Sequence, residues 1–180
     1  GLARAIATIR DVEELLSEIT QQISERFNYY HVGIFLIDNN KEYAVLRAAS
    51  SDGGQKMLRR DHRLKVGEVG IVGYVTGSGQ TRIAGDVGEE AVYFDNPDLP
   101  ETLSEMALPL VFSDEIIGAL DIQSKESNAF SKEDIEVFLI LADQVALAIQ
   151  NARSLVKAQL ALEEADRANQ KLTKQAWASF

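Results

Sequence analysis

The chain has 180 residues, which fits one domain with extensions, and a core of that size folds without disulfides or metals to hold it. It contains no cysteine, which excludes disulfides, thiolate metal sites, cysteine nucleophiles and thioether-linked chromophores, and fits a reducing cytoplasm. The net charge of −10, from 28 acidic and 18 basic residues, argues against a nucleic-acid partner, because phosphate backbones are bound by clustered Lys and Arg.

Residues 1–27 are predicted to form an N-terminal helix. Apolar residues recur there every three or four positions, and from residue 2 onward neither Pro nor Gly interrupts them. The pattern includes Ile9, Val12, Leu16, Ile19 and Ile23. We expect Ile9, Leu16 and Ile23 to lie in an interface with the helix of a second copy.

Short apolar runs predict the strands of a central sheet. Residues 31–38 are apolar nearly throughout, so both faces of this strand must be covered. A turn signal follows, and residues 42–49 are predicted to be its hairpin partner. Further strands are predicted at 81–84, 106–112 and 116–123, the last two joined by a tight hairpin.

A glycine-punctuated short helix is predicted at 67–79. Gly67, Gly70 and Gly73 have the spacing G-x-x-G-x-x-G, which is not the dinucleotide-binding pattern G-x-G-x-x-G, and no Gly-Lys-Ser/Thr follows. We prefer close packing of this helix on the sheet, with a nucleotide-binding loop as the alternative.

Two connecting segments carry opposite charge. Residues 50–65 form a polar connector whose second half gathers Lys and Arg, whereas residues 86–105 contain seven acids, two prolines and no basic residue. The second segment is predicted to be a loop with at most one helical turn. We hypothesise that the two attract each other as a charged lid over a pocket; the alternative is two separately solvated loops.

A helix of about 50 residues is predicted to begin at Ser131. The sequence Ser131 to Asp134 has the pattern of a capping box, and no Pro or Gly follows as far as residue 180. Such a helix is roughly 75 Å long, more than a core of this size can cover. Its second half, residues 151–180, is predicted to be a coiled-coil signalling helix.

A seven-residue repeat supports that interpretation. The repeat positions are Leu141, Ala148, Leu155, Leu162, Asn169 and Ala176. We expect Ala148, Leu155, Leu162 and Asn169 to lie in the interface of a homodimer, where Asn169 would favour a parallel pair. The alternative is a helix extended only by its context.

The order of these elements, and three local motifs, resemble a GAF domain. The motifs are V-G-E-V-G-I-V-G-Y-V-T-G at 66–77, A-L-P-L-V at 107–111 with I-G-A-L-D-I at 117–122, and F-S-K-E-D at 130–134. The resemblance covers about residues 12–151. It implies an α+β fold with a mostly antiparallel sheet of five to six strands, flanked by helices and carrying long N- and C-terminal helices, with the sensor domain at 28–150.

The resemblance implies a regulatory role, as in bacterial sensor kinases. Such a module binds, or once bound, a small molecule over its sheet and passes a conformational change to an output domain through paired helices. The alternative is a ligand-free structural dimerisation domain. Ser124 and Ile135 replace the Asn and Glu of the signature that cyclic-nucleotide-binding members carry, so a cyclic nucleotide is not expected. No cofactor is expected either: a covalent bilin needs a cysteine, and haem lacks a favoured ligand.

We expect the pocket to be lined from several elements. Asp121 shares one face of its strand with Ala119 and Gln123, and a carboxylate in so apolar a run must be paired. Either Arg82 or Arg47 pairs with it, or it caps a nearby backbone NH, or it faces the pocket and meets a donor of a ligand. The predicted ligand-binding residues, which include three aromatics able to stack on a planar ligand or simply to pack, are Arg47, Ile71, Tyr74, Arg82, Tyr93, Phe94, Met106, Leu108 and Asp121.

No catalytic or metal site is expected. The sequence has no G-x-S-x-G and no H-E-x-x-H. Its two histidines, His31 and His62, do not stand at metal-ligand spacing from each other or from a carboxylate. We therefore expect the chain not to be an enzyme.

The ends of the chain bear on location. No stretch approaches the roughly 20 apolar residues of a membrane span, and there is no signal peptide. We expect no membrane span in this fragment and a cytoplasmic protein. The chain begins with Gly1 rather than Met, so we expect a longer parent protein with an output domain.

Overall fold

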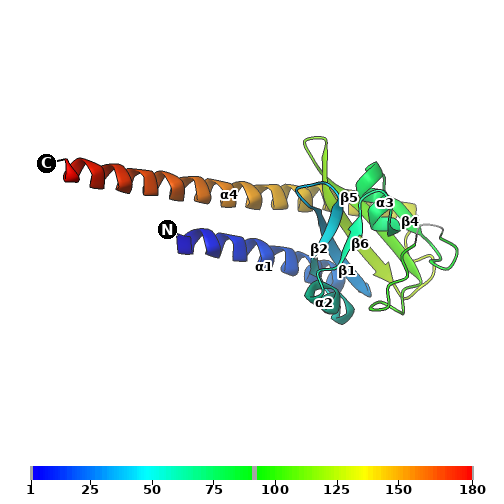
Figure 1. The fold of residues 1–180 in the computed structure, drawn as a ribbon. Coiled ribbons are helices and arrows are strands. Elements are labelled where there is room, and N and C mark those ends of the chain that lie inside the picture. The colour runs from blue at the N-terminus through cyan, green and yellow to red at the C-terminus, as the bar shows by residue number, and fades with distance from the viewer. Residues whose placement is uncertain (1, 91–92, 180) are drawn as a thin grey trace.

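The computed structural model describes residues 2–90 and 93–179. A curved sheet carries helices on both faces, and two long helices project from it side by side (Figure 1). In chain order the elements are α1 (Leu2–Phe27), β1 (His31–Ile37), β2 (Tyr43–Ala49), α2 (Asp52–Arg59), β3 (Arg63–Lys65), α3 (Gly70–Ser78), β4 (Arg82–Ala84), β5 (Ser104–Phe112), β6 (Glu115–Ser124) and α4 (Lys132–Ala178).

The sheet has six strands in the order β3-β2-β1-β6-β5-β4, and every neighbouring pair is antiparallel. Two hairpins, β1–β2 and β5–β6, join through the pairing of β1 with β6 at its centre. The predicted α+β architecture, with five to six mostly antiparallel strands and two long terminal helices, is confirmed.

Alternate residues of each central strand serve two separate cores. On β6, Leu120 and Ile122 pack with Phe138 and Val145 of α4. Ala119, which precedes Leu120, faces the other way and packs in the core under α2 and α3. Gly118 has no side chain because a Cβ there would lie 2.0 Å from the Phe35 carbonyl oxygen. One strand therefore touches both the long helices and the layer that covers the other face.

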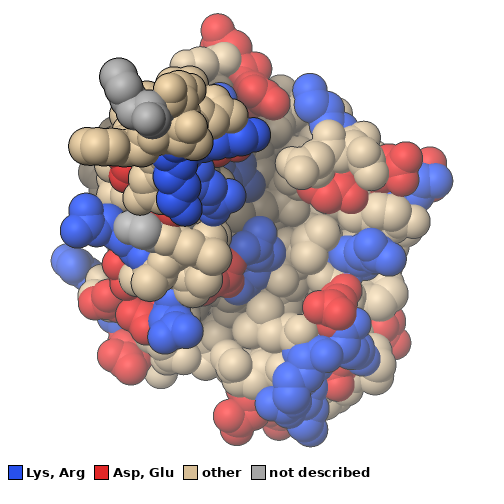
Figure 2. Space-filling model, turned by 60° about the vertical axis from the view of Figure 1, so that its left-hand side comes forward, with Lys and Arg blue, Asp and Glu red and all other residues tan. Residues whose placement is uncertain are grey.

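The two long helices run in opposite directions, with both chain ends far from the sheet and α4 reaching beyond α1 (Figure 1). Ser131 caps α4 with the predicted capping box. Seen with the helix ends brought forward, Lys and Arg are interspersed with Asp and Glu, so no single sign of charge covers this face (Figure 2).

One helix among the described residues, α4, is long and apolar enough to cross a membrane by length and composition alone. Its most apolar window has a mean hydropathy of 1.4 and is 28% buried. Phe138, Val145 and Ile149 of α4 are buried in the core against the sheet. Because a core helix passes the same test, this is weak evidence for a membrane span.

The connector at 50–65 differs from its prediction as a purely polar segment. It contains α2, which begins after the N-cap Ser51, and the short edge strand β3. Met57 is the large buried side chain of α2. A helix of eight residues with one large buried side chain has too little apolar periodicity to be recognised in the sequence.

Candidate functional site

The strand register gathers polar side chains on the sheet face that lies under α2 and α3. Gln123 of β6 stands between His31 of β1 and Glu105 of β5. Two residues earlier on β6, Asp121 lies between Gly33 of β1 and Ala107 of β5. Directly opposite residues of antiparallel strands share a face. The small neighbours of Asp121 therefore make room on this face for the surrounding side chains: a Cβ at Gly33 would lie only 3.0 Å from His31 Nε2.

Gln123 links the two carboxyl groups of this cluster. Its amide nitrogen donates to Asp121 Oδ2 at 2.8 Å and to Glu105 Oε1 at 3.4 Å. Its amide oxygen accepts a hydrogen bond of 2.6 Å from the Thr102 hydroxyl. All four side chains are buried. The cluster is thus a buried hydrogen-bond network within an otherwise apolar core.

Burial shifts the acid–base behaviour of this cluster. It raises the pKa of Glu105 well above the ordinary value, and the charge of Asp121 and a hydrogen bond with it act in the same direction. Burial also lowers the pKa of His31 to about 4, although Asp121 opposes the shift. The pKa of His62 is lowered by burial and by Arg60. Near pH 7 both histidines are neutral, so neither supplies a positive charge to the carboxyl pair.

The two arginines predicted to pair with Asp121 pair elsewhere. Arg82 forms an ion pair with Glu90 at 2.6 Å and stacks over the Tyr74 ring. Arg47 points to the other face of the sheet and pairs with Glu13 of α1. The alternative of a pairing arginine was therefore wrong: Arg47 and Asp121 lie on opposite faces of the sheet, and Arg82 is held by Glu90 and Tyr74.

Asp121 and His31 keep polar atoms without partners among the described residues. Asp121 Oδ1 and His31 Nε2 are buried and form no hydrogen bond there. His31 Nε2 lies 4.0 Å from Asp121 Oδ2, beyond hydrogen-bond distance, while His31 Nδ1 lies 2.7 Å from the Ser51 hydroxyl. A buried polar atom without a partner is costly, and it marks a place where a missing donor would bind.

A small cavity opens beside this cluster. It has about 20 Å³ of free space, enough for about one water molecule. Its polar walls are Asp121, Gln123, Glu105, His62 and Asn96, and its apolar walls are Phe35, Met57, Leu64, Ile71, Val72 and Phe94. Phe94 is 37% exposed, so it forms the side of the cavity nearest solvent.

The structure brings together some of the predicted ligand-binding residues. Ile71, Phe94 and Asp121 line the cavity, and Tyr93 packs in the same core. The pKa of Tyr93 is raised by burial, then by the charges of Glu105 and Asp121. Tyr74 and Arg82 form a stacked pair beside that core.

Met106 and Leu108 lie on the wrong face to bind a ligand in this cavity. Both pack with α1 and α4 in the other core. Their neighbours Glu105 and Ala107 take the cavity face instead. The alternation along β5 was assigned with the wrong phase, because apolar residues occupy both faces of this strand.

The polar residues of the site that sequence reasoning missed include His31, His62, Glu105 and Gln123. They come from four different segments, and only the strand register makes neighbours of His31, Gln123 and Glu105. The available signal was the pattern of polar residues at 121 and 123 on one face of an apolar strand. It identified the face but not the partners across it.

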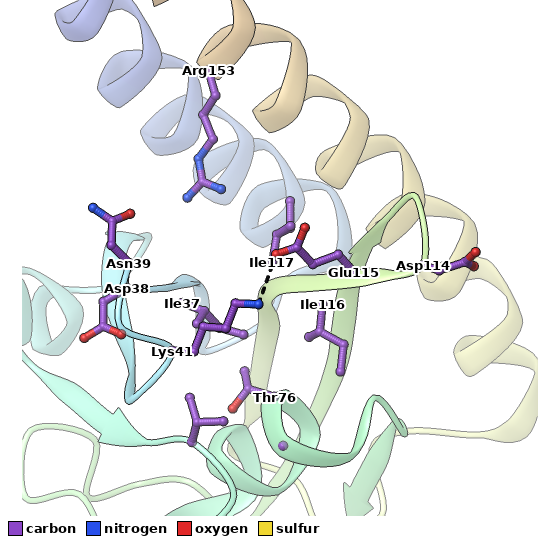
Figure 3. Close-up of a pocket in the computed structure, with 12 residues that line it drawn as sticks. Ile37, Asp38, Asn39, Lys41, Thr76, Asp114, Glu115, Ile116, Ile117 and Arg153 are labelled. Atoms are coloured by element: carbon purple, nitrogen blue, oxygen red, sulfur yellow. Dashed lines mark ion pairs between the residues drawn. The ribbon is translucent and has the colours of Figure 1, made fainter. Parts of the chain in front are cut away.

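A larger groove lies at the opposite end of the sheet, with a volume of about 640 Å³. Figure 3 shows Arg153 reaching into it from α4, above the turns that join β1 to β2 and β5 to β6. Lys41 and Glu115, one from each turn, form an exposed ion pair of 3.8 Å across it. The groove is open, its Lys41–Glu115 pair is exposed and Arg153 is half-buried, so among the described residues that line it no charged group is buried as Asp121 is.

The predicted interface residues fall into two groups. Leu16 and Ile23 of α1 are buried within the chain, against the sheet and α4, so they are not available to a second copy. Ala148 is partly covered, while Ile9, Leu155, Leu162 and Asn169 are exposed. The described residues thus leave an apolar seam on the projecting part of the helices.

One ion pair joins the two oppositely charged segments. Arg60 Nη2 lies 2.5 Å from Asp98 Oδ2, and Arg60 also contacts Asn96. Asn96 in turn contacts the Met57 sulfur. The acidic segment therefore lies over the cavity and is held to the end of α2, as the lid hypothesis requires, although its opening stays a prediction.

Comparison with known proteins identifies the family. Residues 9–150 match the family model of the GAF domain. A curated relative, GAF domain-containing protein A of Dictyostelium discoideum, is 29% identical over 119 residues, which cover 66% of this chain and 69% of the relative. The GAF domain of a phosphoenolpyruvate-protein phosphotransferase from Coxiella burnetii superposes with a TM-score of 0.70 at 25% identity, covering 85% of this chain and 94% of that one.

Two other structures with this fold are enzymes. Free methionine-R-sulfoxide reductase of Thermoplasma acidophilum has a TM-score of 0.68 at 22% identity and covers 80% of this chain and 96% of its own. The enzyme of Neisseria meningitidis, solved with its substrate, has a TM-score of 0.69 at 22% identity over 80% and 81%. The prediction that the chain is not an enzyme was wrong, because hydrolase motifs are no test for other reactions on this fold.

Proposed function

The chain belongs to the GAF family, whose members are generally regulatory sensors, and from this premise we propose that it binds a small molecule in the cavity beside Asp121 and signals through α1 and α4 to an output domain. One observation carries the proposal. Asp121 and its neighbours Leu120 and Ile122 are consecutive residues of β6, yet the first lines the cavity and the others pack on the long helices. A shift of this strand would therefore move both the cavity wall and the residues that pack on the long helices.

The coupling uses packing rather than a flexible link. Leu120 and Ile122 lie in the same core as Phe138, Ala142 and Val145 of α4. Protein cores are close-packed, so a strand displaced by a ligand must shift or rotate the helix that it contacts. If two packings of the helices differ by a few kcal/mol, a ligand that prefers one of them changes the populations.

The output side of the proposal is a parallel homodimer. The exposed seam of α4 contains Leu155 and Leu162, with Asn169 one heptad further on. α1 adds Ile9, which is also exposed. A long helix whose apolar seam has no partner in its own chain is stabilised when a second copy covers that seam. Leu16 and Ile23, buried in the monomer, have no part in this interface.

Two charges placed in the seam are expected to give monomers. Leu155→Asp combined with Leu162→Asp would put four carboxylates in one interface of the dimer, while the domain core, which lacks both residues, stays folded. Analytical ultracentrifugation measures the mass, and circular dichroism checks the fold. Leu160→Asp is the matched control, because Leu160 is exposed outside the heptad positions and its replacement should leave the dimer intact. A double variant that still sediments as a dimer would place the interface elsewhere.

A ligand is expected to raise the melting temperature. A compound at 100 times its dissociation constant stabilises the folded state by about 2.7 kcal/mol. The panel should hold amines, amino acids, organic acids, nucleotides, haem, methionine and methionine sulfoxide. Because two structures of this fold are methionine sulfoxide reductases, the sulfoxide is also incubated with a dithiol and assayed for methionine. Formation of methionine would make catalysis, not sensing, the function of the cavity.

The second candidate is a structural dimerisation domain without a ligand. The observation in its favour is the small free volume, about 20 Å³, which leaves no room for a metabolite unless the covering loop moves. A panel without any stabilising compound, together with a stable dimer, would support this candidate and refute the sensor.

A further inference from the structure

The buried carboxyl groups Asp121 and Glu105 have no basic side chain to neutralise them among the described residues. The arginines nearest in the fold are engaged, Arg82 with Glu90 and Arg60 with Asp98. Lys125, which follows the end of β6, pairs with Glu101 and lies over the Tyr30 ring. Buried charges are ordinarily paired, so the cavity has an excess of acceptors.

One acceptor without a partner belongs to a residue that lines the cavity. Asp121 is 2% exposed and lines the cavity, and its Oδ1 has no hydrogen-bond partner among the described residues, while Oδ2 is held by Gln123. The Glu105 carboxyl lines the same cavity. A donor placed in the free space would meet Asp121 Oδ1, which Gln123 does not hold, and the Glu105 carboxyl group beside it.

An aromatic wall stands beside these acceptors. The ring of His62 lies 6.0 Å from that of Phe35 and 5.8 Å from that of Phe94, and all three line the cavity. Carboxylates combined with aromatic faces suit an organic cation, because the ring face attracts positive charge. An anion would meet the Asp121 carboxylate, with no cation beside it among the described residues, and would be repelled.

We propose that this cavity binds the ammonium group of a small organic amine, with Asp121 as its principal acceptor, Glu105 as its second, and the aromatic residues Phe35, His62 and Phe94 alongside. The inference rests on the proposed sensor function. An ammonium group is about the size of a water molecule, which matches the free space of about 20 Å³. The remainder of the ligand extends out of the cavity past Phe94, the lining residue that is exposed to solvent.

Three probes with three-carbon chains test the charge preference: propylammonium, 1-propanol and propionate, titrated at pH 7 into the ¹⁵N-labelled chain. Propylammonium is expected to give saturable shifts of the backbone amides of Gly33, Ala107 and Asp121, and the other two probes are not. Asp121→Asn, which keeps the shape of the side chain and removes its charge, is expected to raise the dissociation constant for propylammonium by about tenfold to a hundredfold. Glu115→Gln, in the exposed groove, is the control and should bind as the parent does.

Each outcome decides the matter. Saturable shifts by propanol or propionate but not by propylammonium would overturn the amine proposal, as would propylammonium shifts that stay the same in Asp121→Asn. The absence of any shift by propylammonium would also overturn it. The sensor function would survive any of these results if another class of compound stabilised the chain, so the two failures are distinguishable. The comparison of the three probes needs no variant, so it holds even if Asp121→Asn does not fold.

Discussion

Replacing Phe138 with Ala is expected to lower the free energy of unfolding by about 3–5 kcal/mol. Phe138 is 1% exposed and lies near the start of α4, where it packs on the central strands. Its ring meets those of Phe27, 5.0 Å away at 60°, and Tyr29, 5.8 Å away at 56°. The substitution removes a buried aromatic ring and leaves a cavity that the neighbouring rings cannot fill.

Urea unfolding followed by circular dichroism measures this loss, with the slope of the transition compared between variants. Val137→Ala is the matched control, because Val137 is the preceding residue of the same helix and is 53% exposed. It should change the free energy of unfolding by less than about 0.5 kcal/mol. A loss below about 1 kcal/mol for Phe138→Ala would mean that the packing of α4 on the sheet does not depend on this side chain. The proposed coupling between the sheet and α4 would then lack its main contact.

The elements that could be predicted are those with long periodic patterns. The helix at 2–27, the helix after Ser131 and the two hairpins follow from apolar spacing and turn residues, and the structure has all of them. α2 and β3 could not be predicted, since eight and three residues with one large buried side chain carry too little pattern. Fold prediction therefore fails where tertiary contacts, rather than local periodicity, hold an element.

The candidate site was predictable only in part, for a related reason. Asp121 was identified because it is a single acid in an apolar strand. Met106 and Leu108 were misplaced because the run on β5 is apolar on both faces, and its phase is marked only by Glu105 at its start. A residue such as His31, which stands two strands away from Glu105 across Gln123, becomes its neighbour only through the register. Sequence spacing does not contain that register.

The acid sensitivity of the fold is expected to depend on His31. Its pKa is lowered from 6.5 to about 4 because the ring is buried, with the Asp121 charge opposing the shift and that of His62 adding to it. Between these values the unfolded chain binds more protons than the folded one, so the free energy of unfolding falls as the pH is lowered from 6.5 to 4. The contribution lost over this window is about 3 kcal/mol.

His31→Asn removes the titration and keeps a polar group beside Ser51, so the variant should lose less stability than the parent over that window in urea unfolding. Glu105 acts with the opposite sign: its pKa is raised, so its contribution is present below its ordinary value of 4.5 and is lost as the pH rises. Glu105→Gln should therefore steepen the loss on acidification, and the difference between the two variants separates the groups. Parallel stability curves for His31→Asn and the parent would show that His31 is accessible to protons in the folded chain, and the surroundings of His31 would then be more open than its burial indicates.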